Sequence, residues 1–376
     1  MAHTLEEIAQ ELESSQKKVQ LLYAFNGTGK TRLSREFKEL ISPATESDED
    51  TNIIYYNAFT EDLFYWDNDL ENDDERKLII QNNSFTKWVL EVQGKEQNVI
   101  ENFHHYTDEK LTPVFSPDYS EVKFSFQRGN NQSEENIKIS KGEESSFIWS
   151  IFYSLMEQII LELNIPEVDE RSTDEFNNLK YIFIDDPVSS LDENHLIELA
   201  VNIATLINSS YYNNAQGLRF IISTHNPLFY NVIYNELKLN QKKGAYMLSK
   251  NEDGSFELNE KFGDSNKSFS YHLHLRHTLE VAINNNEVQK YHFTLLRNLY
   301  EKTANFLGYK QWSELLPDDK EVYFNRIIQF TSHSTLSNEE VREPTEPEKE
   351  VVKLLFNNLI DNYSYWKEEQ NNDTGN

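Results

Sequence analysis

Three side chains in the last third of the 376-residue chain carry groups that could cleave a phosphodiester by acid–base chemistry. Arg297 and Glu301 are spaced i and i+4, so a helix would place them on one face. His333 ends a later apolar run. A carboxylate and an imidazole can exchange protons with a substrate, while a guanidinium stabilises developing negative charge. Taken alone, the Arg–Glu pair is typical of an exposed salt bridge and the histidine of a structural residue.

A phosphate-binding loop is predicted near the N-terminus. Residues 24–31 read Ala-Phe-Asn-Gly-Thr-Gly-Lys-Thr, a P-loop in which alanine replaces the first glycine. The glycines let backbone amides approach phosphates, the lysine reaches the terminal phosphates, and the threonine offers a hydroxyl to Mg²⁺. The predicted nucleotide-binding residues here are Asn26, Gly27, Thr28, Gly29, Lys30 and Thr31.

Further residues of a nucleotide engine follow. Asp185 and Asp186 end the apolar run 181–184, where a Walker B aspartate would hold Mg²⁺ and the next carboxylate would orient the attacking water. Because glutamate is usual at the second position, Asp186 predicts slower or geometrically different water activation. Residues 190–192, Ser-Leu-Asp, resemble a D-loop, and His225 resembles a switch histidine that contacts the γ-phosphate.

Residues 140–145, Ser-Lys-Gly-Glu-Glu-Ser, resemble the signature of ABC-type ATPases, whose amides close on the γ-phosphate held by a second protomer. All five motifs occur in the ABC order. We therefore predict an ABC-type P-loop NTPase whose complete site needs two heads. The predicted cofactor is ATP or GTP with Mg²⁺. Its further ligands are Ser140, Gly142, Glu143, Asp186, Asp192 and His225, with Thr31 and Asp185 holding the metal.

The elements that must position these residues follow from hydrophobic periodicity. Strands are predicted at 19–23, 122–126, 181–184 and 220–222, and a long helix across 147–160, as in an α/β sheet. A hairpin turn at 251–254 closes this part, and the later pattern is helical. We predict an ABC-type NTPase domain over residues 1–257 and a smaller, mainly α-helical domain over 258–376, which contains Arg297, Glu301 and His333.

Two apolar stripes are predicted in the helical part. One comprises Leu295, Leu299 and Phe306, opposite the Arg297–Glu301 face. The other comprises Val351, Leu354, Leu355 and Leu359, after a capping box formed by Thr345 and Glu348.

Bulk properties limit the function classes. The net charge of −29 argues against non-specific nucleic-acid binding, so any such site must be local. A soluble protein is expected, because no apolar run reaches bilayer length and the first residues do not resemble a signal peptide. The absence of cysteine excludes disulfides and thiolate chemistry and fits a cytoplasmic location.

The combination of this P-loop variant with Arg297, Glu301 and His333 resembles the PrrC family of bacterial anticodon nucleases. General ABC ATPases share the engine but not this triad. The resemblance extends over nearly the whole chain, through residues 23–34, 55–69, 140–149, 181–200, 263–275, 291–309 and 330–339.

That resemblance implies that the helical domain over 258–376 is a nuclease domain. It also implies metal-independent cleavage of lysine tRNA in the anticodon loop, 5′ of the wobble base. The expected ends are a 2′,3′-cyclic phosphate and a 5′-hydroxyl. Glu301 is expected to be the base on the ribose 2′-hydroxyl, His333 the acid to the leaving oxygen, and Arg297 the electrostatic clamp. The roles of Glu301 and His333 are exchangeable.

Residues 261–271 resemble the family segment for anticodon recognition, although an ordinary linker would have a similar composition. Its aromatic residues can stack unpaired bases, and its aspartate can accept hydrogen bonds from a modified wobble base. Lys267, Arg276 and His277 are candidates for holding phosphates. The predicted recognition residues are Asp264, Ser265, Asn266, Lys267, Phe269 and Tyr271.

The resemblance also implies partners. A type I restriction-modification complex would keep the nuclease silent until phage attack, and a thymidine nucleotide (dTTP) would regulate it, in a suicide defence. A homo-oligomer with head-to-tail NTPase sites is expected, and no membrane partner.

Two other readings stay open. The chain can be a RecF- or SMC-like ATPase acting on DNA without a nuclease site, which leaves Arg297, Glu301 and His333 as coincidence. It can also be an ABC head used as a sensor, with its C-terminal helices docking a partner effector.

Overall fold

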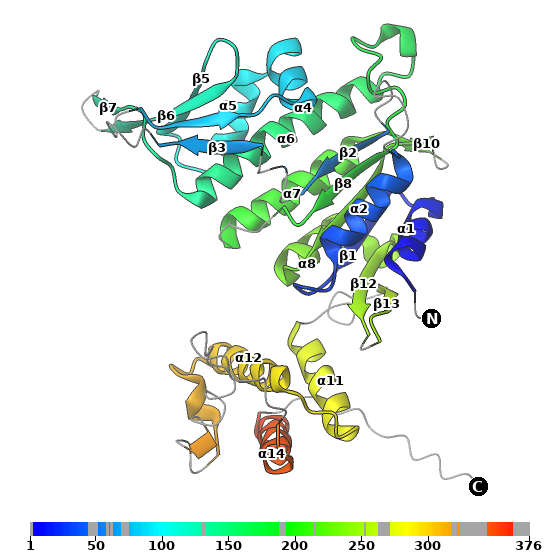
Figure 1. Cartoon of the computed structure of the whole chain (residues 1–376), viewed down its shortest axis with the longest axis vertical. Helices are drawn as coiled ribbons and strands as arrows, with labels where there is room; N and C mark the ends of the chain where they lie inside the picture. The colour runs from blue at the N-terminus through cyan, green and yellow to red at the C-terminus, as the bar shows by residue number, and fades with distance from the viewer. Residues whose placement is uncertain are drawn as a thin grey trace. The chain divides into compact units, whose positions relative to one another are not determined.

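A computed structural model describes residues 3–43, 52–57, 60, 63–68, 75–128, 132–187, 193–213, 216–251, 253–261, 271–317, 320, 322–323 and 344–363. The chain forms two compact units, Met1–Ser268 and Phe269–Asn376 (Figure 1). The predicted boundary after residue 257 falls inside β13 (Phe256–Lys261), which pairs along its length with β12 (Ala245–Lys250). The first sheet therefore extends past that boundary.

The central sheet of the first unit has the order β13-β12-β1-β11-β8-β2. All neighbouring strands are parallel except β12 and β13. Register pairs Tyr23 with Thr224 and Ser223 with Asp185, so three strands end at one edge. The remaining bounds are β1 (Val19–Tyr23), β2 (Ile53–Tyr56), β8 (Tyr181–Asp185) and β11 (Arg219–Thr224), which confirms the predicted strands at 19–23, 181–184 and 220–222.

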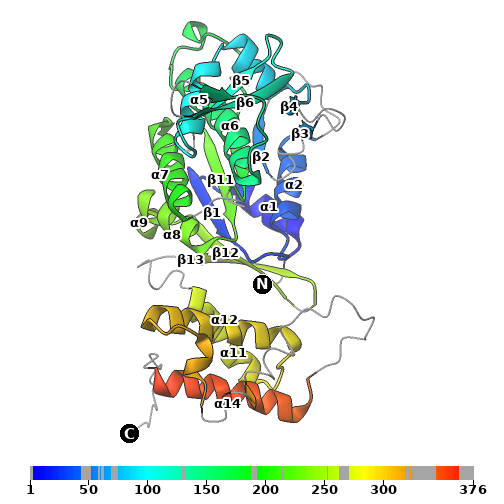
Figure 2. The same ribbon diagram turned by 90° about the vertical axis from the view of Figure 1, so that its left-hand side faces the viewer.

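Helices cover both faces of this sheet, as a buried parallel sheet requires. Figure 2 shows α1 (Leu5–Ser14) and α2 (Lys30–Ile41) on one side, and α7 (Glu193–Ser209) and α8 (Pro227–Glu236) on the other. On the first side, the Phe37 ring lies edge-on to the Tyr181 ring, with centroids 5.0 Å apart. The predicted α/β architecture is thus confirmed.

A second, antiparallel sheet carries the order β3-β4-β6-β5, with β7 paired to β6. It packs on α6 (Lys141–Leu163), whose Phe147 contacts Phe64, Phe115 and Phe124. Within the described part of the chain, α6 alone is long and apolar enough to cross a membrane, but 78% of its apolar window is buried in this core. The bounds are β3 (Phe64–Asp67), β4 (Lys77–Ile80), β5 (Leu111–Phe115), β6 (Glu121–Arg128) and β7 (Gln132–Glu134).

Short elements complete the first unit. They are α4 (Ser84–Lys87), a π-helix (Trp88–Val92), α5 (Glu96–His104), a 3₁₀ turn (Val168–Glu170), β9 (Tyr212–Asn213), β10 (Gln216–Gly217) and α9 (Leu239–Lys242).

The second unit is helical. It comprises α11 (Tyr271–Asn284), α12 (Lys290–Leu307), a 3₁₀ turn (Trp312–Leu315) and α14 (Glu346–Asn362). Its core gathers Leu279, Leu296, Leu299, Leu355 and Leu359, all fully buried. The predicted N-terminal cap of α14 forms, because the backbone N–H of Thr345 donates to Glu348 Oε2 at 2.7 Å.

Two members of the predicted stripes are exposed instead of buried. The Phe306 side chain is 89% exposed and Leu354 is 47% exposed. The last buried residue of α12 is Ala304, so Phe306 lies in a final turn that extends beyond the core. The face of α12 that packs inward runs through Phe293, Leu296 and Tyr300.

Candidate functional site

The P-loop connects β1 to α2 in the geometry that phosphate binding needs. Gly27 has φ +80° and Gly29 has φ +112°, backbone conformations that favour glycine. The atypical Ala24 is fully buried in the core, and its N–H donates to the Thr224 carbonyl at 3.0 Å. Among the described residues with a positive φ, Ala24 does not occur. Alanine therefore fits at this position, and packing explains the departure from glycine.

Lys30 begins α2 and turns its ammonium group back toward the loop. The side chain is only 7% exposed, and Nζ donates to the Ala24 carbonyl at 3.2 Å. Nζ also lies 3.7 Å from Asp186 Oδ2. A cation held over the loop at a helix N-terminus is suited to the terminal phosphates of a nucleotide.

Asp185 and Thr31 form a pair that fits a magnesium ion. Asp185 is 2% exposed, and burial raises the pKa of its carboxyl, while hydrogen bonds from Ser223 and Thr31 oppose that rise. A hydroxyl beside a carboxylate supplies the hard oxygen ligands that Mg²⁺ prefers. No three His, Cys, Asp or Glu residues gather as a metal site within the described ranges. The phosphates of a bound nucleotide and water would supply further oxygen ligands to the ion.

Asp186 contacts the predicted switch histidine directly. Its φ is +56°, and its N–H donates to the Ser223 carbonyl at 2.8 Å. The carboxylate pairs with His225 Nδ1 and accepts a hydrogen bond from Thr224 Oγ1 at 3.3 Å. The residue after the Walker B aspartate and the histidine after β11 are thereby joined, although they come from different strands.

The signature-like segment lies at the start of α6. Ser140 Oγ accepts a hydrogen bond from the Glu143 N–H at 3.3 Å, and the Ser140 N–H donates to Glu143 Oε2 at 2.7 Å. Gly142 follows in the first turn. The next glutamate, Glu144, is 5% exposed and accepts from Trp66 Nε1 of β3 at 2.9 Å, which ties the helix start to the antiparallel sheet. The D-loop residues 190–192 lie outside the described residues.

Sequence reasoning missed a polar group at the end of β2. Tyr55 OH lies 2.6 Å from Ser34 Oγ of α2 and accepts from Asn57 Nδ2 at 2.8 Å. Ser34 Oγ in turn lies 3.4 Å from Asp185 Oδ2. This chain of hydrogen bonds links β2 to the candidate magnesium ligand. Only the pairing of β2 with β8 brings Tyr55 there, so no local motif could have indicated it.

We expect Tyr55→Phe to lower the free energy of unfolding by about 1 kcal/mol, because Asn57 Nδ2 loses its acceptor. The Mg²⁺ concentration for half-maximal nucleotide hydrolysis should rise as well, since Ser34 loses one of its partners beside Asp185. Thermal unfolding and Mg²⁺ titration measure these effects. Tyr65→Phe on β3 is the matched control, because that side chain is 52% exposed. Equal behaviour of the two variants would contradict the role of Tyr55.

In the second unit, the structure places Arg297 and Glu301 in contact. Arg297 Nε donates to Glu301 Oε1 at 2.7 Å, and the two side chains are 34% and 35% exposed. The Arg297 guanidinium lies 6.0 Å from the centre of the Trp312 ring. Both side chains of the pair are thus partly exposed to solvent. His333 lies outside the described residues, and the catalytic roles stay a prediction.

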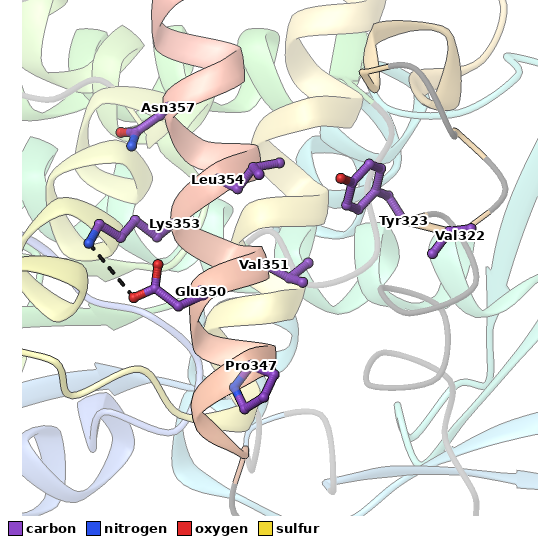
Figure 3. A pocket seen from close by; sticks show the side chains of 8 residues that line it. All are labelled: Val322, Tyr323, Pro347, Glu350, Val351, Lys353, Leu354 and Asn357. Atoms are coloured by element: carbon purple, nitrogen blue, oxygen red, sulfur yellow. Dashed lines mark ion pairs between the residues drawn. The ribbon is translucent and has the colours of Figure 1, made fainter.

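Two of the cavities that described residues line lie in this helix bundle. One of about 590 Å³ lies between α14 and the short segment 322–323, and neither Arg297 nor Glu301 lines it (Figure 3). The other, of about 510 Å³, has Glu301 in its wall together with Asn305, Lys310, Gln311, Trp312 and Ser313.

Most predicted anticodon-recognition residues cannot be placed. Asp264, Ser265, Asn266, Lys267 and Phe269 lie outside the described residues, as does the side chain of Tyr271, which begins α11. Of the other phosphate candidates, Arg276 pairs with Glu280 at 3.6 Å, and His277 is exposed.

The strand order and the loop geometry define a P-loop NTPase. In agreement, a family model described as AAA domain matches residues 115–357. Among solved structures, the Smc head of Pyrococcus yayanosii is 14% identical, covering 47% of this chain and 28% of that one, at a TM-score of 0.30. The SMC head domain of Thermotoga maritima is 12% identical, covering 65% and 90%, at 0.27. These two likenesses are too weak to add to the fold assignment.

A curated anticodon nuclease of Escherichia coli is 56% identical to this chain over an alignment of 402 positions, which covers 99% of the chain and all of that protein. The chain therefore belongs to the anticodon nuclease family. This confirms the resemblance to PrrC-type enzymes that the motifs indicated.

Proposed function

We propose that this chain is a nucleotide-regulated endoribonuclease that cleaves lysine tRNA in the anticodon loop, 5′ of the wobble base. The observation that carries the proposal is the Arg297–Glu301 contact, partly exposed on α12, in a chain similar throughout to an anticodon nuclease. A guanidinium bonded to a carboxylate at this helix surface is a suitable arrangement for a phosphodiester with a neighbouring ribose hydroxyl.

In the proposed reaction, Glu301 takes the proton of the ribose 2′-hydroxyl, and the 2′-oxygen attacks phosphorus. The bond from phosphorus to the 5′-oxygen breaks as His333 donates a proton to that oxygen. The products are a 2′,3′-cyclic phosphate and a 5′-hydroxyl. Arg297 fixes the orientation of Glu301 and stabilises the charge on the phosphoryl oxygens. Each group needs only its own protonation chemistry, so the proposed step is metal-independent.

The first unit is proposed to control this step. ATP or GTP would bind the P-loop, with Mg²⁺ held by Thr31 and Asp185, and His225 with Asp186 would orient the attacking water. When bound, Mg²⁺ neutralises charge on the phosphates. Ser140 and Gly142 of a second copy would complete the site, which implies a head-to-tail homo-oligomer. Asp192 is proposed to act at the same interface.

The cellular setting follows from the family resemblance and is likewise proposed. A type I restriction-modification complex would silence the nuclease in the cytoplasm, and dTTP would stabilise the active state. Release on phage infection would then make the protein a suicide defence toxin of the abortive-infection type.

A cleavage assay in chelator tests the reaction. The purified protein is first activated with ATP or GTP and Mg²⁺, then mixed with bulk tRNA in excess EDTA, and the broken ends are mapped. We expect one cut in lysine tRNA with a cyclic phosphate on the upstream fragment. Loss of cutting in EDTA by a chain that still holds its activating nucleotide would contradict metal independence, and absence of cutting under every condition would favour an ATPase without a nuclease site.

A further inference from the structure

A polar row runs along α12 into the cavity beside Glu301. Arg297, Glu301 and Asn305 are spaced i, i+4 and i+8, so they succeed one another on one side of the helix. Gly308, with φ +79°, ends the helix and turns the chain, so that residues 310–313 face the end of the row and complete the cavity wall. The cavity is therefore continuous with the candidate catalytic pair.

Trp312 supplies the aromatic part of this wall. Its ring packs against Tyr300 of the core, with centroids 6.2 Å apart, and the Arg297 guanidinium lies over it. Tyr300 is itself fixed, because its hydroxyl donates to the Leu355 carbonyl at 2.8 Å. The indole is thus anchored on one side by the core while it lines a cavity on another. A pre-positioned ring of this kind offers a stacking surface without a large ordering cost.

The remaining wall groups suit a nucleotide. Asn305 brings an exposed amide that both donates and accepts, and Lys310 brings an exposed cation. A volume of about 510 Å³ has room for one base with its ribose. Flat aromatic surfaces with amides and a nearby cation are how proteins bind unpaired nucleotides. Because the net charge of −29 disfavours nucleic-acid binding by the surface as a whole, contact with RNA needs a local site that combines an aromatic ring, an amide and a lysine, as this cavity does.

We propose that this cavity binds one unpaired nucleotide next to the scissile phosphate, with its base stacked on Trp312, its edge hydrogen-bonded to Asn305 and its phosphate near Lys310. The inference rests on the proposed function and deepens it, because it assigns a substrate subsite to the same face of α12. Trp312 and Asn305 are specificity and positioning residues in this view, while Glu301 remains the reacting group.

Equilibrium binding to an uncleavable RNA tests the subsite. The probe is an anticodon stem-loop of lysine tRNA with a 2′-O-methyl group at the cleavage position and 2-aminopurine in turn on each side of the scissile phosphate. We expect the full chain to quench one of the two probe positions through stacking. Trp312→Ala should weaken binding about tenfold or more, Trp312→Phe should retain most of the affinity, and Asn305→Ala should weaken binding about threefold to tenfold.

Phe306→Ala is the matched control, because Phe306 is an 89% exposed aromatic residue of the same helix and does not line the cavity. The affinity of Phe306→Ala for the uncleavable RNA should equal that of the unmodified chain. If Trp312→Ala fails to fold, the quenching of the probe and the affinity of Asn305→Ala for the RNA still test the proposed subsite. The subsite alone is overturned if the chain cleaves tRNA normally but neither probe position is quenched. It is also overturned if cleavage is normal and both Trp312→Ala and Asn305→Ala bind the RNA with unchanged affinity. A chain that neither binds nor cuts tRNA overturns the proposed function with it.

Discussion

Replacing Glu301 with glutamine is expected to slow tRNA cleavage by about a hundredfold or more, the range typical for loss of a general acid or base. Glutamine has nearly the same shape and can still accept the hydrogen bond that Arg297 Nε donates at 2.7 Å. It cannot take a proton from a ribose hydroxyl. The change therefore removes proton transfer while it leaves α12 and its contacts in place.

Single-turnover cleavage of lysine tRNA measures this effect, with nucleotide hydrolysis as the internal reference that should not change. Glu350→Gln on α14 is the matched control, since Glu350 forms a more exposed ion pair within a helix, 3.7 Å from Lys353. Cleavage by Glu301→Gln at the rate of Glu350→Gln would show that Arg297 and Glu301 form only a surface salt bridge, which contributes little to stability.

Replacing Lys30 with alanine is expected to weaken nucleotide binding by about tenfold to a hundredfold, as for loss of a charge-assisted hydrogen bond to phosphate. Hydrolysis should fall further, because the ammonium group is also needed as charge builds on the transferred phosphoryl group. The side chain is 7% exposed and is held by the Ala24 carbonyl, so its position is defined before a nucleotide arrives.

Titration with a fluorescent ATP or GTP analogue tests binding, and cleavage with and without prior nucleotide tests control. In Lys30→Ala, prior nucleotide should no longer change the cleavage rate. Lys38→Ala, an exposed lysine two turns later in α2, should behave as the unmodified chain does. Nucleotide-dependent activation that persists in Lys30→Ala would place the controlling nucleotide at another site.

Much of the nucleotide site could be predicted because the backbone conformations and buried strands that it requires are properties of short segments. Gly27 and Gly29 adopt backbone conformations that few other residues tolerate, and the strand that ends at Asp185 is apolar up to that residue because both its faces are covered. The predicted boundary after residue 257 divided β13, because the alternation of an edge strand does not by itself show where that strand ends.

The helical unit shows where periodicity stops being informative. Arg297 and Glu301 share a face because of helical spacing alone, and the structure places them in contact. Phe306 has the same spacing from Leu299 that core residues have, yet it is 89% exposed. Spacing gives the direction of a side chain, but only the length of the neighbouring elements decides whether something covers it.

The sequence by itself determined the phosphate loop, the buried strands, the order of the motifs and the i, i+4 pair, because backbone conformation and helical spacing are properties of short segments. Only the tertiary structure decided that β11 lies between β1 and β8, that Tyr55 reaches Ser34 beside Asp185, and that Trp312 stands beside Arg297. Those contacts join segments far apart in the chain. Their partners are selected by packing of whole elements, which no local pattern encodes.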